Sequence, residues 1–438
     1  MFEPEQVADA RGTVARPRSV LRDRNFRRLW IGETISILGT TISGFAIAIV
    51  AVVMLQATPA EMGLMRSLGV LPTIAVGLFA GVWIDRFVRR RLLVTLDLIA
   101  AVAVASVPVA YLAGVLSLWQ LFALSIVFGV LEAFWDPAWG SFLPMVVERD
   151  RLVDANSKAT LSMSATGIVG PGIGGFLVQV LSAPVAMVAD AASFVVSAIC
   201  VGGVRTREMS GTSSDGEDTE PFATRIREGL RTAFLDPMQR SVTAPLAILE
   251  FVNALSQAVY AIFVLRVVGL SPASLGIIFA VASAGFLAGS AVAPRLERRM
   301  RAGRAAILGL GLVAASPFTM VLARAEHPDW LNLVFLGLPG IVGGFGGIVQ
   351  WVMLSSIRQA ITPERLLGRV FASVGVLGGS LTIAGALIGG ALGGTIGPRW
   401  TILVATVGYT VPFFWTLFGP VRDATTDHPA GTASGAEV

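Results

Sequence analysis

Six carboxylates interrupt the apolar stretches of this chain, where an ionised group finds little water. They are Glu33, Asp97, Glu132, Asp136, Asp190 and Glu250. Glu132 and Asp136 are four residues apart, so a helix places both on one face, and a low dielectric disfavours the state in which both are ionised. Such a pair suits reversible protonation, although Asp136, which precedes Pro137, equally suits pairing with loop arginines. The chemistry that these residues offer inside a membrane is proton carriage.

A polar stripe runs along the helix predicted at residues 241–265. Glu250, Asn253, Gln257 and Tyr260 recur there at helical spacing. A lipid-facing surface would not carry such a stripe, so we expect it to face a cavity. Further cavity candidates are Thr40, Gln350 and the aromatic residues Phe134, Trp135, Trp139 and Trp351. The aromatic residues suit either stacking on an apolar substrate or ordinary helix packing.

The stretch GPGIGG, residues 170–175, places four glycines and a proline inside another apolar run. Small residues four apart let membrane helices approach closely. Pro171 also leaves the carbonyl of Gly167 without its helical donor, so a neighbouring helix must supply one. Glycine pairs at this spacing occur at Gly77/Gly81, Gly170/Gly174, Gly285/Gly289 and Gly385/Gly389. The alternative is that glycine and proline are simply commoner in membrane helices.

Little else in the chain could support covalent chemistry. Cys200 is the single cysteine, and His327 and His428 lie in polar stretches outside the apolar runs. We therefore expect no disulfide, no metal, no cofactor and no enzymatic activity, because the sequence shows no cysteine cluster, phosphate loop or nucleophile–base pair.

The elements that hold these residues are membrane helices. Of the 438 residues, 54% are hydrophobic and 14% are charged, whereas soluble domains carry about 25% charged residues. Apolar runs of about 20 residues predict twelve helices, at 29–55, 61–83, 91–112, 118–140, 158–181, 184–204, 241–265, 272–293, 305–323, 331–356, 369–395 and 399–419.

The cationic residues indicate the topology. The N-terminal segment and alternate connections hold 29 of the 33 lysines and arginines, the other connections hold three, and Arg66 lies within a span. The positive-inside rule then places both termini in the cytoplasm of a multi-pass plasma-membrane protein. The net charge of +4 is thus a topology signal, and no nucleic-acid partner is expected.

The sequence also repeats itself. Asp150, Arg151, Leu152, Gly175 and Pro184 are each echoed 214 residues later. Tandem halves are a transporter architecture with the substrate site near the midplane between them. The predicted organisation is a cytoplasmic segment (1–28), a six-helix bundle (29–208), a cytoplasmic linker (209–240) with a disordered stretch at 209–221, a second bundle (241–420) and a disordered tail (421–438).

These features resemble the major facilitator superfamily over essentially the whole chain. GVWIDRFVRRRLL (81–93) is similar to its signature loop between helices 2 and 3, and GPGIGG to its helix-5 antiporter motif. NFRRLW (25–30), FWDPAW (134–139) and PERLLGRVF (363–371) are similar to the branch with macrolide efflux proteins and the enterobactin exporter. One departure is that residues 121–134 lack the arginine that antiporters often carry early in helix 4, so coupling schemes that use it cannot be carried over.

The resemblance implies an all-α fold of two pseudo-symmetric six-helix bundles. Helices 1, 4, 7 and 10 would line the cavity, which favours as proton-coupling candidates Glu132, Glu250, Glu33 and Asp136. Helices 2 and 11, and helices 5 and 8, would face each other across the two halves. This implies that the glycine pairs lie at the interface between the halves, together with the motif residues Gly170, Pro171, Gly174 and Gly175.

The resemblance also implies a cytoplasmic gate, with Asp85 capping the start of helix 11 near Arg369. Its members would be Asp85, Arg86, Arg89, Arg90 and Arg369. Two expectations concern other charges. Arg66 needs a partner, for which we choose Asp190 at a similar depth, and Asp97 is expected to have a structural role near the 89–91 arginines.

We therefore predict a secondary transporter that exports a bulky amphipathic small molecule, such as a drug, antibiotic, natural product or siderophore, by proton antiport with alternating access. Its partners would be the substrate, protons and the lipid bilayer, and it would act as a monomer. One alternative is a lipid or lysophospholipid flippase or facilitator on the same fold. Another is a transport-inactive receptor or assembly partner.

Overall fold

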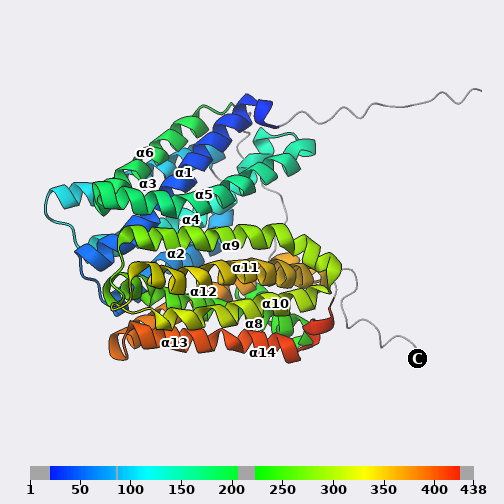
Figure 1. The fold of residues 1–438 in the computed structure, drawn as a ribbon. Coiled ribbons are helices and arrows are strands. Elements are labelled where there is room, and N and C mark those ends of the chain that lie inside the picture. The colour runs from blue at the N-terminus through cyan, green and yellow to red at the C-terminus, as the bar shows by residue number, and fades with distance from the viewer. Residues whose placement is uncertain (1–19, 85–86, 206–221, 425–438) are drawn as a thin grey trace, which may run out of the picture.

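The structure is a computed structural model that describes residues 20–84, 87–205 and 222–424. All regular elements in these ranges are helical (Figure 1). Eleven spans are long and apolar enough to cross a membrane, and α2, with 26 residues, occupies the remaining predicted position. The prediction of an all-α protein with twelve spans is confirmed.

The first bundle begins directly after an N-cap, because the Asp23 carboxylate accepts hydrogen bonds from the backbone N–H groups of Asn25 and Phe26. Its helices are α1 (Arg24–Ile49, continued by a π-helical turn at Val50–Met54), α2 (Pro59–Ile84), α3 (Arg89–Leu112), α4 (Leu118–Val146), α5 (Leu152–Leu181) and α6 (Ala183–Gly202).

The second bundle repeats this order. Its helices are α8 (Pro237–Ile262, continued by a π-helical turn at Phe263–Val267), α9 (Pro272–Arg299), α10 (Ala302–Ala315, continued by a 3₁₀ segment at Ser316–Leu322), α11 (Asp329–Ile361), α12 (Leu367–Thr395), and α13 (Pro398–Gly408) with α14 (Thr410–Phe418), which together form the last span. The π-helical turns at the ends of α1 and α8 occupy equivalent places in the two halves.

The two bundles touch mainly along two helix pairs, α2 with α12 and α5 with α9, and α2 also contacts α8. These are the cross-half pairs that the resemblance implies, and the contacts confirm them. Figure 1 shows the bundles meeting at one end and diverging toward the end at which both described chain termini lie. The molecule is therefore closed at the end opposite its termini.

A short helix, α7 (Phe222–Leu235), lies within the predicted linker. It packs on α12, where Ser373 Oγ donates to the carbonyl of Ile226 at 3.2 Å and Arg369 pairs with Glu228. The predicted disordered stretch, residues 209–221, lies outside the described residues. At the C-terminus, residues 420–423 form a 3₁₀ turn whose Asp423 pairs with Arg301 and Arg304, at 3.3 and 3.1 Å. The first residues of the predicted disordered tail are therefore ordered, and residues 425–438 lie outside the described residues.

The connections that precede α6 and α13 share an unusual backbone conformation. Ser182, the N-cap of α6, has φ 84° and ψ 154°, and Gly397, the N-cap of α13, has φ 87° and ψ 157°. This region is adopted almost solely by glycine, and a residue with a Cβ there is strained by about 1–3 kcal/mol. The N-cap of α6 is therefore a strained serine, whereas the N-cap of α13 is a glycine.

We expect Ser182→Gly to stabilise the protein by about 1 kcal/mol, because it removes this strain without removing a side-chain contact. Gly397→Ala should destabilise it by a similar amount. Thermal unfolding of the purified protein in detergent would measure both variants. A lower unfolding temperature for Ser182→Gly would contradict the argument.

Candidate functional site

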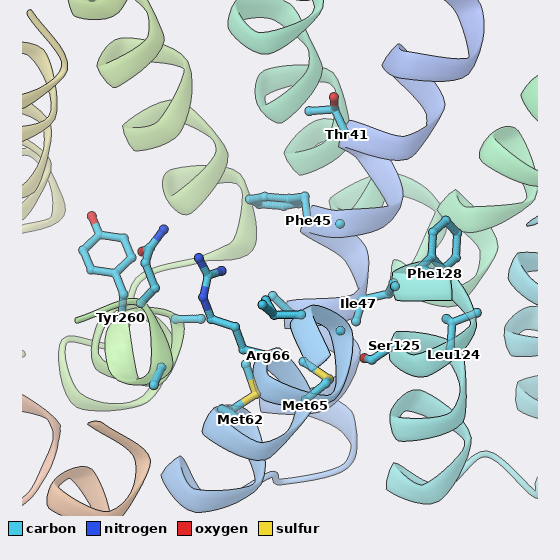
Figure 2. Close-up of a pocket in the computed structure, with 18 of the residues that line it drawn as sticks. Thr41, Phe45, Ile47, Met62, Met65, Arg66, Leu124, Ser125, Phe128 and Tyr260 are labelled. Carbon is cyan, nitrogen blue, oxygen red and sulfur yellow. The ribbon is translucent and has the colours of Figure 1, made fainter. Parts of the chain in front are cut away.

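A cavity of about 730 Å³ lies between the two bundles. Its walls come from α1, α2, α4 and α5 on one side and from α8 and α9 on the other. They are mainly apolar, with the aromatic and thioether side chains of Phe45, Phe128, Phe279, Met62 and Met65. Figure 2 shows several of these side chains around the open space. Such a lining suits a bulky, largely apolar ligand.

A second cavity, of about 430 Å³, opens inside the first bundle and shares Thr41, Phe128 and Glu132 with the central one. Its wall carries four carboxylates and no basic side chain among the described lining residues. Glu33 and Asp97 are buried, and Glu132 and Asp136 are exposed to the cavity. We call these four carboxylates the acid group. The predicted cavity residues Thr40 and Trp135 lie on the same wall.

The acid group includes Asp97, for which the sequence predicted a structural role near the 89–91 arginines. Asp97 is 4% exposed, accepts a hydrogen bond from Ser197, and acts electrostatically on Glu33. Asp97 lies about two turns further along α3 than the 89–91 arginines, on a helix that packs mainly on α6. Its structural role near those arginines stays a prediction. The spacing of residues along α3 could not show that Asp97 belongs to the acid group, because the other three acids lie on α1 and α4.

A third cavity, of about 410 Å³, lies in the second bundle and shares Gln257, Tyr260 and Phe279 with the central cavity. The polar stripe of α8 lines it, as do the amide of Gln350 and the phenol of Tyr409. Thr382 donates a hydrogen bond to Glu250 at 3.5 Å, and Gln350 Nε2 donates to the carbonyl of Gly347 at 3.1 Å. The structure thus places the predicted stripe on a cavity wall. Trp351, by contrast, is 56% exposed and lines none of these cavities.

Arg66 projects into the central cavity from α2, between Phe45 and Tyr260 (Figure 2). Its electrostatic neighbours are Glu250 and Tyr409 of the second bundle. Asp190 is instead fully buried and accepts a hydrogen bond from Ser193 at 3.1 Å. The predicted pairing of Arg66 with Asp190 is wrong, because equal depth in the membrane does not bring two helices together.

The helix-5 motif contributes directly to the interface between the bundles. Ser283 Oγ of α9 donates a hydrogen bond of 2.8 Å to the carbonyl of Gly167, the group that Pro171 leaves without a helical donor. A Cβ added to Gly276 of α9 would lie 2.7 Å from the Pro171 carbonyl oxygen and 3.1 Å from the Cα of Gly175. Only glycine permits this approach of α5 to α9.

Two other motif glycines, Gly170 and Gly174, face the interior of the first bundle. Gly170 packs on Thr41 of α1. A Cβ added to Gly174 would lie 3.5 Å from Ile42 and from Phe45 of the same helix. The expectation that this pair lies between the halves is therefore wrong.

The same correction applies to the glycine pairs of the second bundle. Gly285 and Gly289 pack on α11, and Gly385 and Gly389 pack on α8. Across the α2–α12 contact the close approaches are instead Gly63 to Ala386 and Gly390 to Ala60. Gly77 has open space, and the surroundings of Gly81 lie outside the described residues.

At the closed end, Arg266 links the bundles. Its Nε donates to the carbonyl of Val52 at 3.0 Å and its Nη1 to the carbonyl of Ala57 at 2.9 Å. Arg266 lies in the π-helical turn of α8, and Val52 lies in the equivalent turn of α1. Sequence reasoning missed this contact, although Arg266 is one of three cations on the less basic side.

The predicted gate lies at the opposite end. Asp85 and Arg86 lie outside the described residues. Arg89 donates to Ser141 at 3.1 Å, Arg90 donates to the carbonyl of Val204 at 3.1 Å, and Arg369 pairs with Glu228 of α7. The linker helix therefore reaches the position at which the resemblance implies an interaction with Asp85.

Comparisons with known proteins agree with this geometry. Residues 15–432 match the family described as transmembrane secretion effector. The multidrug efflux pump Tap of Mycolicibacterium fortuitum is 29% identical over 77% of this chain and 82% of its own length. Macrolide efflux protein A of Streptococcus pyogenes is 21% identical over 91% of this chain and 96% of its own length.

Among solved structures, a bacterial homologue of the iron transporter ferroportin in its inward-facing state superposes with a TM-score of 0.74. The two chains are 17% identical, and the match covers 91% of this chain and 99% of that one. At this identity the likeness shows the fold alone.

We expect Arg266→Gln to loosen the closed end, because a glutamine side chain is too short to bond both carbonyls. In a Cys200→Ser background, a cysteine introduced at Gln257 would report access to the cavity. A membrane-impermeant maleimide, added to the closed face, should label that cysteine faster in Arg266→Gln, and Arg266→Lys should lie between this variant and the parent. Equal labelling rates in all three would show that the arginine does not hold this end closed.

Proposed function

Because the chain belongs to the transmembrane secretion effector family of the major facilitator superfamily, we propose that it exports a bulky amphipathic small molecule in exchange for protons. The observation that carries this proposal is the central cavity, whose apolar walls join directly to the acid group. As a member of a transporter family, the protein is not an enzyme. The direction of transport is supported by relatives that are named as efflux pumps.

The closed end of the molecule would face outward in this mechanism. Positive-inside asymmetry supports this orientation, because the cationic connections lie at the end that carries the termini. The substrate would then enter the cavity from the cytoplasm or the inner leaflet. Separation of Arg266 from Val52, and of Ser283 from Gly167, would accompany opening to the outside.

Protons would be carried by the acid group. Four carboxylates that share one cavity without a basic lining residue disfavour full ionisation, so the group retains protons that it can exchange. Glu132 is the described acid that lines both the acid cavity and the central cavity. A substrate in the central cavity would therefore reach the proton sites through Glu132. The membrane potential supplies about 2.3 kcal/mol per proton per 100 mV, which is enough for accumulation of several tenfold.

We expect substrate-driven proton movement to depend on Glu132. In inverted vesicles with an imposed pH gradient, a fluorescent pH probe would report its dissipation after addition of a macrolide, ethidium or a lysophospholipid. Glu132→Gln should abolish the response, since glutamine cannot exchange a proton. Glu148→Gln removes a carboxylate of 73% exposure outside the cavities and should leave the response intact.

The alternative functions predict other outcomes. If a lysophospholipid redistributes while no compound moves protons, the flippase or facilitator alternative replaces proton antiport. If no compound moves and no proton flux appears, the result favours the transport-inactive receptor. A full response in Glu132→Gln would keep antiport but assign the proton to another acid.

A further inference from the structure

The central cavity contains a permanent positive charge. Arg66 is the one basic side chain among the described residues that line it. A guanidinium stays protonated at every accessible pH, so it cannot lower the cost of its position by losing a proton. An uncompensated charge in a low-dielectric site is expensive, which means that a partner is needed when the cavity closes and expels water.

The surroundings do not supply that partner directly. Among the described residues, Arg66 has no hydrogen bond and no ion pair within 4 Å, and its side chain is exposed to the cavity. Phe45, Met62 and Met65 form the adjacent wall and offer no anion. Figure 2 shows the guanidinium directed into the open space.

An opposing charge on the other bundle belongs to Glu250, which lines the third cavity. Glu250 and Tyr409 act on Arg66 electrostatically, but the Glu250 carboxylate contacts Thr382 rather than the guanidinium. Arg66 and Glu250 thus face each other across the interface with a gap between them. Gln257 and Tyr260, which line the same region, offer neutral hydrogen-bonding groups beside that gap.

We propose that Arg66 binds an acidic group of the transported compound, so that the substrate is an amphipathic anion with a carboxylate or phosphate on an apolar body. This inference deepens the proposed export function and rests on it. A guanidinium presents two parallel N–H donors that match either oxyanion. The apolar body would occupy the space lined by Phe45, Phe128 and Phe279.

Glu250 acts as a competitor in this arrangement. The Glu250 carboxylate offsets part of the charge of Arg66 and disfavours the approach of a second anion. The acid group lies mainly around the second cavity, and its member Glu132 also lines the central cavity. An anion on Arg66 lets the cavity close without an uncompensated cation.

Direct binding tests this without any transport step. The probes are 11-(dansylamino)undecanoic acid, its primary amide and the matching undecylamine, titrated by fluorescence into purified protein in detergent. The wild type should bind the acid at least about tenfold more tightly than the amide, since a charge-assisted hydrogen bond is worth that much or more. Dodecanoate and dodecyl phosphate, as unlabelled competitors, distinguish a carboxylate-selective site from a phosphate-selective one.

Three variants make the result specific. Arg66→Gln should remove the preference for the acid and leave amide binding unchanged, and Arg66→Lys should retain part of the preference. Glu250→Gln should strengthen acid binding, which a merely misfolded variant could not do. Arg295→Gln, a surface arginine on α9 that bonds its own helix, is the matched control and should behave as wild type.

The inference falls if the wild type binds acid and amide equally, binds neither, or prefers the amine in a manner that survives Arg66→Gln. It also falls if Arg66→Gln weakens all three probes alike. These outcomes leave the export proposal standing if an amine or neutral compound still drives proton movement in vesicles. Conversely, acid binding through Arg66 without any proton movement would preserve the anion site and overturn the antiport.

Discussion

A backbone carbonyl in a hydrocarbon environment must have a donor, and this constraint shapes the contact between the two bundles. Pro171 removes the helical donor of Gly167, and Ser283 from the opposite bundle replaces it. Ser67 of α2 likewise approaches the carbonyl of Ile383 on α12, at 3.4 Å. Arg266 binds two carbonyls near the π-helical end of α1, where the helical ladder is interrupted. The bundles are thus joined through acceptors that water could satisfy equally well once this end opens.

This type of contact differs from the packing inside each bundle. The paired glycines lie within the halves, where Gly285 and Gly289 admit α11 and Gly385 and Gly389 admit α8. Close backbone packing over several turns makes each half rigid. Between the halves, backbone approaches occur at Gly175 with Gly276, at Gly63 with Ala386 and at Gly390 with Pro59. Hydrogen bonds from Ser283 and Arg266 to single carbonyls add to them, and these hydrogen bonds are the part of the interface that water could replace if the bundles separated.

The sequence predicts the helices well because apolar runs of membrane length have no other stable solution. It predicts the cross-half helix pairs through family resemblance. The sequence does not predict which neighbouring helix a side chain contacts, because this depends on the rotation of each helix about its own axis. Gly174 and Gly175 differ by one residue, about 100° of rotation, and one faces α1 while the other faces α9. The same limit explains the wrong partner that was predicted for Arg66. The helix α7 was not predicted, because its 14 residues, which include three arginines, do not form an apolar run of membrane length.

Charged and polar side chains are also distributed unequally between the two bundles. The acid group belongs to the first bundle, while the neutral amides and phenols that line the third cavity belong to the second. Two elements connect these regions to the central space, Glu132 on one side and the pair Gln257 and Tyr260 on the other. Arg66 and Glu250 face each other across the boundary, so their interaction changes whenever the bundles rotate. A ligand that contacts both bundles binds with different affinity to each relative orientation of the bundles. A difference in affinity of this kind shifts a conformational equilibrium. Coupling in the proposed exporter would then act through this interface as well as through Glu132, which lines both the central cavity and the acid cavity.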